Sequence, residues 1–462
     1  MLLTLSFLFY LPKILFGFWL AHTFWRESSP QALLFKFFLG IFIGMGLWSL
    51  GYFLWLWAGL NRFIFPWLES IVSLTIIVLA LTHRKPALKL PTGFTPNSFR
   101  KLISPLNLTF LLVISAAAVL FGIRLYMNPH GYEDAWFIWN LDSRFIYLAQ
   151  NFRILYIRGG PGWHPDYPLM VSLNVVSGWV LLGQDNTRVP IAVTALFTLA
   201  IPGVFFSGLA LLKDNKQAIL ATIVLLASSP IIHEGASQQA DIPVAGFILA
   251  SLVLVALFFR TKEDNLLFLA GLTTSLTAWA KNEGFLFIAI NTILLIAFLV
   301  GLRRIHSIKK YVLGLTIPLS VILFYKFSIP VTNDLMVIKN LSQFLSWDRY
   351  GFILNNMADS IGNLGRWSVI NLAALLFVYA LLTWFDCPEP VTVKFLGLVL
   401  LLQLAGYIAI YVLTPHDLAW HMLTSRERLV LQLFPTSLFL FFYSIHSPNF
   451  NLWEVYKNAA RH

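Results

Sequence analysis

Two adjacent carboxylates, Glu133 and Asp134, stand in the longest hydrophilic stretch of the chain, residues 128–167. A carboxylate beside a reacting hydroxyl can take its proton, so this pair is a candidate general base. The other side chains of this stretch that could bind or polarise a ligand are Asp142, Arg144, Arg153, Arg158, His164 and Asp166, interleaved with Trp136, Trp139, Tyr147, Tyr156 and Trp163. We therefore expect the stretch to carry the functional site.

The residues after Asp134 follow a helical period. Its apolar stripe consists of Phe137, Ile138, Leu141, Phe145 and Leu148. Acids in the first turn of a helix are favoured by the helix dipole, so the pair also has a purely structural explanation. Two adjacent acids at a bilayer surface are costly without a partner, however, and this favours a functional role.

Two further segments carry polar side chains between apolar ones. In GWHPDYPLM (162–170) the prolines fix a turn, and His164 and Asp166 form a poor metal signature, so a structural role is favoured over metal binding. In HEGASQQADIP (233–243), Asp241 either caps the following helix or joins its polar neighbours in a site. The sequence leaves these two alternatives open.

Lys281 and Glu283, in AWAKNEGF (278–285), barely interrupt a hydrophobic run. A lone lysine would snorkel to the interface, whereas this cluster indicates the wall of a site. Segment 414–435 predicts one polar helix face, made of Asp417, His421, Thr424, Ser425, Arg428 and Gln432. We expect this face to line a cavity, with Arg428 offering the fork geometry that binds phosphate. Snorkelling to headgroups explains Arg426 better than Arg428.

The composition is that of an integral membrane protein. Hydrophobic residues make up 58% and charged residues 11% of the chain, against roughly 25% charged residues in soluble domains. The 41 Phe and 16 Trp suit lipid contact and interfacial belts. The single cysteine, Cys387, excludes an intramolecular disulfide and argues against a thiolate metal cluster. We interpret the first apolar segment as a retained helix, not a cleaved signal.

Apolar runs long enough to span a bilayer predict an all-α polytopic fold of about 13 transmembrane helices. They lie near 2–24, 33–57, 64–82, 107–127, 189–212, 217–233, 242–259, 265–280, 284–302, 311–328, 368–385, 395–413 and 429–445. Residues 168–183 predict a short interfacial or re-entrant helix. The chain divides into a three-helix extension with a basic loop (1–106), a core (107–328) and C-terminal helices (329–462).

The net charge of +11 reflects topology. With the basic loop 83–101 in the cytoplasm, alternating spans place most Lys and Arg residues on that side, as the positive-inside rule requires. This distribution excludes nucleic acid as a partner. It places the loop 128–188 outside, together with the loops 329–367 and 414–428. The expected location is a bacterial inner membrane, with the active site facing outward.

The order of these motifs resembles the type C glycosyltransferase superfamily, and within it the protein mannosyltransferase and aminoarabinose transferase branch. The resemblance consists of an acidic pair in the first outer loop, H-P-D-Y-P-L (164–169) before a short helix, and N-T-R-V-P (186–190) opening the next span. It covers roughly residues 107–300 and the 414–435 stripe.

The resemblance implies an inverting transferase that moves a sugar from a polyprenyl-phosphate lipid to a glycan, lipid or protein acceptor. Asp134 would be the base, although Glu133 stays an alternative. Because the turn at 164–168 lacks the lysine usual in that branch, the donor phosphate would be bound by Arg188, Lys281 or Arg428. Asp241 would position the sugar or a divalent metal ion, which some relatives use. The remaining candidates for substrate binding are Glu283, His421, His164 and Asp166.

The alternative function is a transporter or flippase of a lipid-linked or anionic solute. It predicts matching half-repeats with broken helices and charges near the membrane midplane. The sequence shows no matching halves, and its charges fall mostly at the outer boundary. A structural subunit would leave the acidic pair unexplained.

Overall fold

The computed structural model describes residues 2–83, 104–149, 152–157, 164–329, 338–363, 371–386 and 388–447. Over these ranges the chain folds into helices, and its β pairing is limited to an isolated bridge between Phe385 and Ile445. The predicted all-α polytopic architecture is therefore confirmed. Cys387, Arg158 and Trp163 lie outside the described residues, as does most of the basic loop 83–101.

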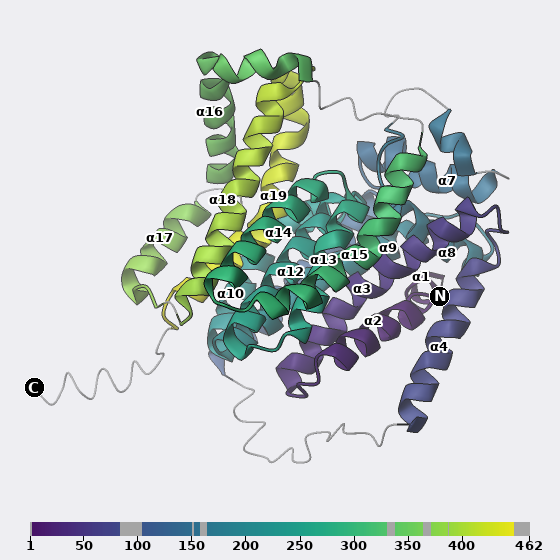
Figure 1. Cartoon of the computed structure of the whole chain (residues 1–462), viewed down its shortest axis with the longest axis horizontal. Coiled ribbons are helices and arrows are strands. Elements are labelled where there is room, and N and C mark those ends of the chain that lie inside the picture. The colour runs from purple at the N-terminus through teal and green to yellow at the C-terminus, as the bar shows by residue number, and fades with distance from the viewer. Residues whose placement is uncertain are drawn as a thin grey trace, which may run out of the picture.

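The elements follow one another along the chain as shown in Figure 1. They are α1 (Leu2–Leu8), α2 (Leu11–Phe24), α3 (Pro30–Trp57), α4 (Phe65–His83), α6 (Pro105–Met127), η1 (Ala135–Trp139), α7 (Asn140–Leu148), η2 (Phe152–Tyr156), α8 (Met170–Leu182), α9 (Arg188–Leu212), α10 (Asn215–Ala227), α11 (Ser229–Gly235), α12 (Asp241–Thr261), α13 (Asn265–Ala280), α14 (Gly284–Gly301), α15 (Ile305–Ser328), η3 (Ile338–Leu345), α16 (Trp347–Asn363), α17 (Leu372–Thr383), α18 (Pro390–Leu413) and α19 (Leu418–Ser444).

Within the described ranges, nine helices are long and apolar enough to cross a membrane, and a tenth span exists if α10 and α11, bent by 62°, are counted together. The sequence predicted about 13 spans. The difference lies in α13 and α17, with 16 and 12 residues, and in α19, whose first turns carry charged side chains. All three predicted segments are helical, but they do not meet the length and composition of a simple span.

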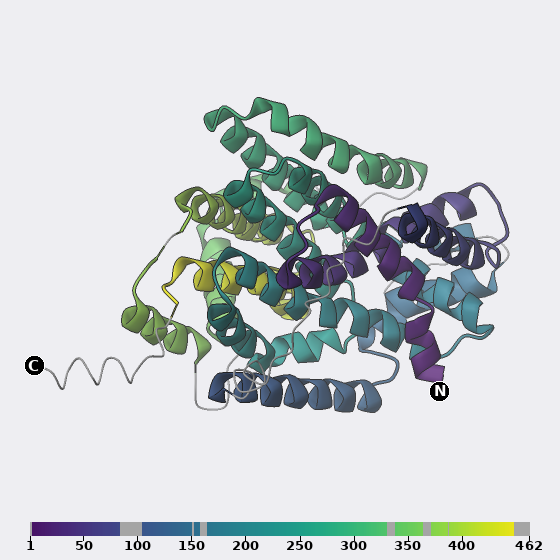
Figure 2. The ribbon, with the colours of Figure 1, turned by 90° about the horizontal axis from the view of Figure 1, so that it is seen from below.

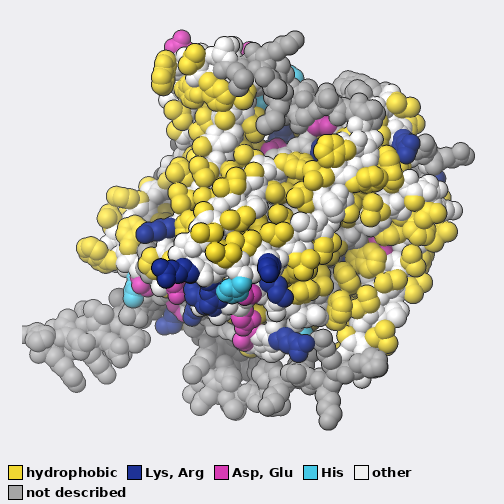
Figure 3. All heavy atoms as spheres, in the orientation of Figure 1, with side chains coloured by type: hydrophobic (Ala, Val, Ile, Leu, Met, Phe, Trp, Pro, Cys, Tyr) yellow, Lys and Arg dark blue, Asp and Glu magenta, His cyan; other side chains and the backbone are white. Residues whose placement is uncertain are grey.

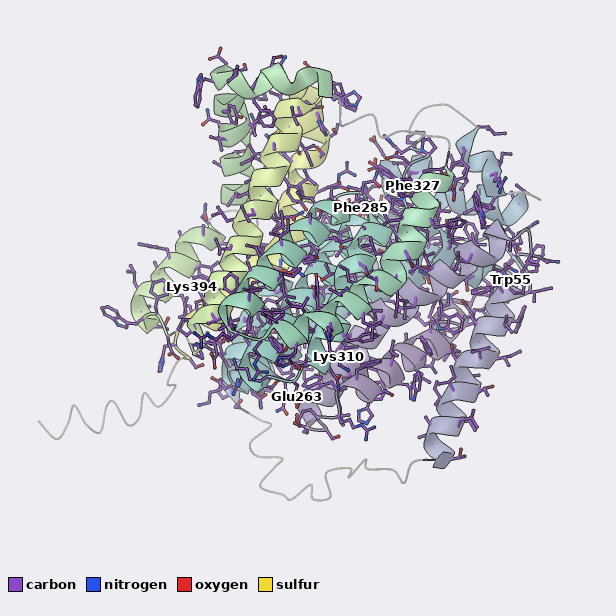
Figure 4. The ribbon with its side chains drawn as sticks, viewed as in Figure 1. Trp55, Glu263, Phe285, Lys310, Phe327 and Lys394 are labelled. Carbon is purple, nitrogen blue, oxygen red and sulfur yellow. The ribbon has the colours of Figure 1, made fainter. Side chains whose placement is uncertain are left out.

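Charged side chains gather at one end of the bundle, while the surface between the ends is largely hydrophobic (Figure 3). Lys310, Lys394 and Glu263 mark this end in Figure 4. Phe285 and Phe327 lie toward the opposite end. Apolar sides with a basic end are the pattern of an integral membrane protein.

Helix α12 lies at the centre of the fold. Every residue from Asp241 to Phe259 is buried, so the helix has no lipid-facing side. It packs against α3, α9, α13, α18 and α19. The predicted N-terminal extension shares this core, because Phe42 of α3 packs against Phe197 and Phe247. The ring centroids are 5.8 and 5.1 Å apart. By contrast, α6 is largely exposed along one edge of the bundle (Figure 2).

Two helix pairs approach so closely that only glycine fits between them. A Cβ on Gly17 of α2 would lie 2.1 Å from the carbonyl oxygen of Gly40 in α3. In the pair α13 and α15, a Cβ on Gly271 would lie 2.2 Å from the Tyr311 carbonyl oxygen, and one on Gly314 would lie 2.0 Å from that of Phe268. Small residues of this kind let helices associate in lipid, where hydrophobic burial supplies no driving force.

A buried ion pair joins α2 and α4, with 3.0 Å between Lys13 Nζ and Glu69 Oε1. Helix α8 supplies hydrogen-bond partners to both charges. Ser177 Oγ donates to Glu69 at 2.7 Å, and Lys13 donates to Ser177 and Asn174 at 3.0 and 3.3 Å. The sequence predicted an interfacial or re-entrant helix at 168–183. Helix α8 is short, as predicted, and it is buried inside the bundle, where its hydroxyl and amide groups satisfy these charges.

The glycine contacts yield a stability prediction. Gly271→Ala forces α13 and α15 apart, so we expect it to lower the free energy of unfolding by about 1–3 kcal/mol. The matched control is Gly122→Ala in α6, where an added Cβ meets nothing within 4 Å. Thermal unfolding of the purified variants measures both effects. Equal melting temperatures for Gly271→Ala and Gly122→Ala would contradict the close contact.

Candidate functional site

Charged side chains from four separate segments meet at the start of α12. We call Asp134, Asp241, Lys281, Glu283 and Arg428 the charge cluster. Lys281 Nζ lies 3.0 Å from both Asp241 Oδ1 and Glu283 Oε1. Arg428 Nη1 donates to Asp134 Oδ2 and lies 4.0 Å from Asp241 Oδ2. Side chains that the sequence separates by up to about 300 residues thus form one continuous set of ion pairs.

The helix ends place these side chains. Asp241 begins α12, and the turn from Lys281 to Glu283 joins α13 to α14. This turn is tight, because a Cβ on Gly284 would lie 2.2 Å from the Thr277 carbonyl carbon. Arg428 projects from α19, which passes beside α12.

Asp134 reaches the cluster because its loop is pinned to the segment before α12. Gly131 adopts φ +77°, and a Cβ there would lie 2.5 Å from the carbonyl oxygen of Ser237. The Tyr132 backbone N–H donates to that same oxygen at 3.1 Å. Asp134 then precedes η1, a short π-helix, which is a form often found at functional sites. The acidic pair is split, since Glu133 is exposed while the Asp134 side chain is only 33% exposed and faces Arg428.

The helical stripe predicted after Asp134 is only partly buried. Among its members Ile138 is buried, Leu141 and Phe145 are partly buried, and Phe137 and Leu148 are exposed. The buried side of η1 and α7 also includes Asp142 and Ser143. The predicted stripe differs from the buried face because the π-helical turn of η1 changes the angular spacing of side chains.

The interior of the cluster is closed to solvent, and its outer edge is open. The side chains of Asp241 and Lys281 are 2% and 6% exposed, whereas that of Arg428 is 20% exposed. Burial by itself would lower the pKa of Lys281, but the carboxylates of Asp241 and Glu283 outweigh it and raise that pKa. Lys281 therefore stays charged. With three acids and two bases, the cluster carries a formal charge of −1.

Among the described residues, only one oxygen of Asp241 accepts hydrogen bonds. Its Oδ1 accepts from Gln432 Nε2 at 2.6 Å as well as from Lys281. Gln432 is in turn held by the Tyr407 hydroxyl, which donates to its Oε1 at 2.5 Å. Oδ2 is buried and has no hydrogen-bond partner. A ligand hydroxyl at the edge of the cluster could supply the missing donor, since an unsatisfied buried acceptor is costly.

The segment 164–169 lies against the Lys281–Glu283 turn. Asn282 Nδ2 donates to Asp166 Oδ2 at 2.6 Å, and Lys326 of α15 donates to Asn282 Oδ1 at 2.5 Å. Burial raises the pKa of Asp166 despite the nearby Lys326. His164 stacks on the ring of Tyr167 at 4.7 Å. These contacts give Asp166 and His164 positioning roles beside the cluster.

Three other predicted residues lie elsewhere. Arg188 begins α9 with its side chain exposed, and within the described ranges no ion pair links it to the cluster. His421 is buried, with its Nδ1 2.9 Å from Thr414 Oγ1 and its ring 4.9 Å from that of Tyr411. Trp139 is buried and stacks on Tyr167, so its ring faces are not open to a ligand.

Two members of the site were not singled out from the sequence, namely Lys326 and Tyr407. Lys326 had a signal, because a lysine inside the predicted span 311–328 is expensive and calls for a partner. Tyr407 had none, because a tyrosine in an apolar helix is common at membrane interfaces. Its link to Gln432 depends on how α18 packs on α19.

In the part of the chain that the structure describes, no group of three or more His, Cys, Asp or Glu side chains is arranged to hold a metal ion. The divalent ion implied by the resemblance stays a prediction. No family model, curated protein or solved structure matches this chain. The site must therefore be interpreted from its own geometry.

The buried pair of Lys281 and Asp241 yields a double-mutant prediction. Lys281→Met leaves two carboxylates without their cation, so we expect it to lower the free energy of unfolding by about 3–5 kcal/mol. Adding Asp241→Asn should recover part of this loss, because one of the uncompensated charges is then removed. Thermal unfolding measures each variant, with the exposed Lys310→Met as the control. Additive losses in the double variant would show that the two side chains are not coupled.

Proposed function

We propose that the protein is an integral membrane glycosyltransferase of the type C class. It transfers a sugar, with inversion, from a polyprenyl-phosphate lipid to an acceptor on the outer face. The observation that supports this most is the contact between Asp134 and Arg428 at the open edge of the charge cluster. It brings a candidate base and a candidate phosphate ligand to one point.

In the proposed reaction Asp134 removes the proton from an acceptor hydroxyl. The acceptor oxygen forms its bond to the anomeric carbon as the bond from that carbon to the phosphate oxygen breaks on the opposite face. One base is sufficient for such an inverting displacement, and no enzyme nucleophile is needed. The 33% exposure of the Asp134 side chain leaves room for the acceptor to approach.

Arg428 has two functions in this proposal. Its guanidinium fork suits a phosphate, and its 20% exposure makes it reachable from outside the bundle. When the donor phosphate occupies Arg428, the Asp134 carboxylate is released from this ion pair and can accept a hydrogen bond from the acceptor hydroxyl. Donor binding would in this way activate the base.

Lys281 and Asp241 act behind this pair. Lys281 is held between two carboxylates, so it keeps the cluster assembled and does not contact the phosphate directly. Asp241 Oδ2, which has no hydrogen-bond partner among the described residues, accepts a hydrogen bond from a hydroxyl of the transferred sugar. Glu283 compensates the charge of Lys281.

A transporter or flippase is the second candidate, and one observation favours it. Lys13 and Glu69 form an ion pair inside two helices long enough to span the membrane, and buried charges of this kind often mark ion or solute paths. Under this alternative the purified protein binds a polyprenyl-phosphate sugar without turning it over. Donor binding would also be insensitive to changes at Asp134.

The decisive variant is Asp134→Asn. We expect it to lower the transfer of radiolabelled sugar from polyprenyl-phosphate donors by about 10²–10⁴-fold, because the base is lost. The matched control is Glu133→Gln, which removes the neighbouring but exposed carboxylate and should leave the rate within a few-fold of wild type. Both are assayed as purified, folded protein against a panel of donors.

Retained transfer in Asp134→Asn, with Glu133→Gln inactive, would assign the base to Glu133. Retained transfer in both variants would overturn the proposed mechanism. Absence of turnover by the wild type with every donor, together with donor binding that Asp134→Asn does not change, would support the transporter.

A further inference from the structure

A groove lined by both polar and apolar side chains lies beside η1, separate from the charge cluster. It has a volume of about 360 Å³, within the range of small-ligand sites. It is formed where the loop before η1, helices η1, α7 and α8, and the start of α9 come together; its lining is Pro129, His130, Trp136, Asn140, Leu141, Arg144, Trp179, Asn186, Thr187 and Pro190. No residue of the charge cluster lines it.

Two indole rings are fixed in this groove by their own N–H groups. Trp136 Nε1 donates to the Gly131 carbonyl at 3.2 Å, and Trp179 Nε1 donates to the Asn186 carbonyl at 2.8 Å. Trp179 is buried and forms part of the wall. Trp136 is 57% exposed, so its ring is held in place and still accessible. A rigid, accessible indole is a platform on which an apolar ring face can stack.

Two amide side chains in the lining have polar atoms without partners. Both amide N–H groups of Asn140 are used, by the His130 carbonyl at 3.2 Å and by Gln238 Oε1 at 2.8 Å, while its Oδ1 is buried and unpaired. Asn186 Oδ1 accepts from the Arg188 backbone N–H at 2.9 Å, while its Nδ2 is buried and unpaired. The lining therefore offers one acceptor and one donor that nothing in the described chain satisfies.

We propose that this groove binds a saccharide. A hydroxyl group both donates and accepts, so the hydroxyls of a saccharide match both the unpaired acceptor of Asn140 and the unpaired donor of Asn186. The C–H face of the same ring stacks on Trp136. The volume accommodates a mono- or disaccharide, and no residue of the lining is an acid that would repel an anionic sugar.

The position of the groove assigns the saccharide as the acceptor, and this assignment rests on the proposed transferase function. Asp134 stands two residues before Trp136, so the base and the platform belong to the same short segment. The hydrogen bond between Asn140 and Gln238 ties the groove to the segment that leads into Asp241. A sugar held at Trp136 thus lies on the short segment that carries the base.

The test is saccharide binding, measured without donor. The full-length protein is placed in lipid nanodiscs free of maltoside detergent, because a glycosidic detergent would compete for the groove. Saturation-transfer NMR is recorded with maltose, cellobiose, lactose, chitobiose and mannobiose. We expect at least one disaccharide to bind, and Trp136→Ala to weaken its affinity about tenfold through loss of ring stacking. Trp136→Phe should retain most of the binding.

Two controls separate this proposal from the transferase mechanism. Trp67→Ala removes a tryptophan of similar exposure, 53%, on α4 outside the groove, and should bind as wild type. Asp134→Asn should also bind as wild type, because Asp134 does not line the groove. Binding retained in Asp134→Asn supports the groove whether or not transfer is lost. Failure of all five disaccharides to bind the wild type, or equal binding by Trp136→Ala and wild type, overturns it.

Discussion

The structure depends on how it pairs charge at the end of a fully buried helix. Helix α12 has no contact with lipid, and it begins with the carboxylate of Asp241. A buried charge of this kind is tolerated only with close partners. Lys281 supplies the first, Gln432 a second and Arg428 a third. The turn between α13 and α14 and the middle of α19 must therefore converge on the start of α12.

Close helix packing makes this convergence possible. Gly271 and Gly314 bring α13 and α15 almost into backbone contact, which sets the position of Lys326 at the far end of α15. Lys326 then donates a hydrogen bond to Asn282, in the middle of the turn that carries Lys281, and Asn282 donates one to Asp166. The close approach of α13 and α15 within the bundle thus helps to position the polar segment at its end. In Figure 1, α18 and α19 extend past the bundle and carry α16 beside them.

Helix η1 separates two environments over a few residues. Asp134, just before it, faces Arg428, while Trp136 within it lines the groove. Residues two apart along a helix point to nearly opposite sides, so these two side chains can face different surroundings. The hydrogen bond from Asn140 to Gln238 links the groove to the segment that leads into Asp241. The acidic pair therefore acts as two unlike residues, one paired and one exposed.

The sequence by itself determined the membrane character, the helical class and most helix positions, because each rests on local hydropathy over about 20 residues. It also marked the polar segments that meet in the charge cluster, since polar side chains are costly in apolar surroundings. It could not decide which of Glu133 and Asp134 faces Arg428, nor show that α8 is buried around Lys13 and Glu69. Those outcomes depend on contacts between residues far apart in the chain. Only the tertiary packing brings the two members of such a contact together.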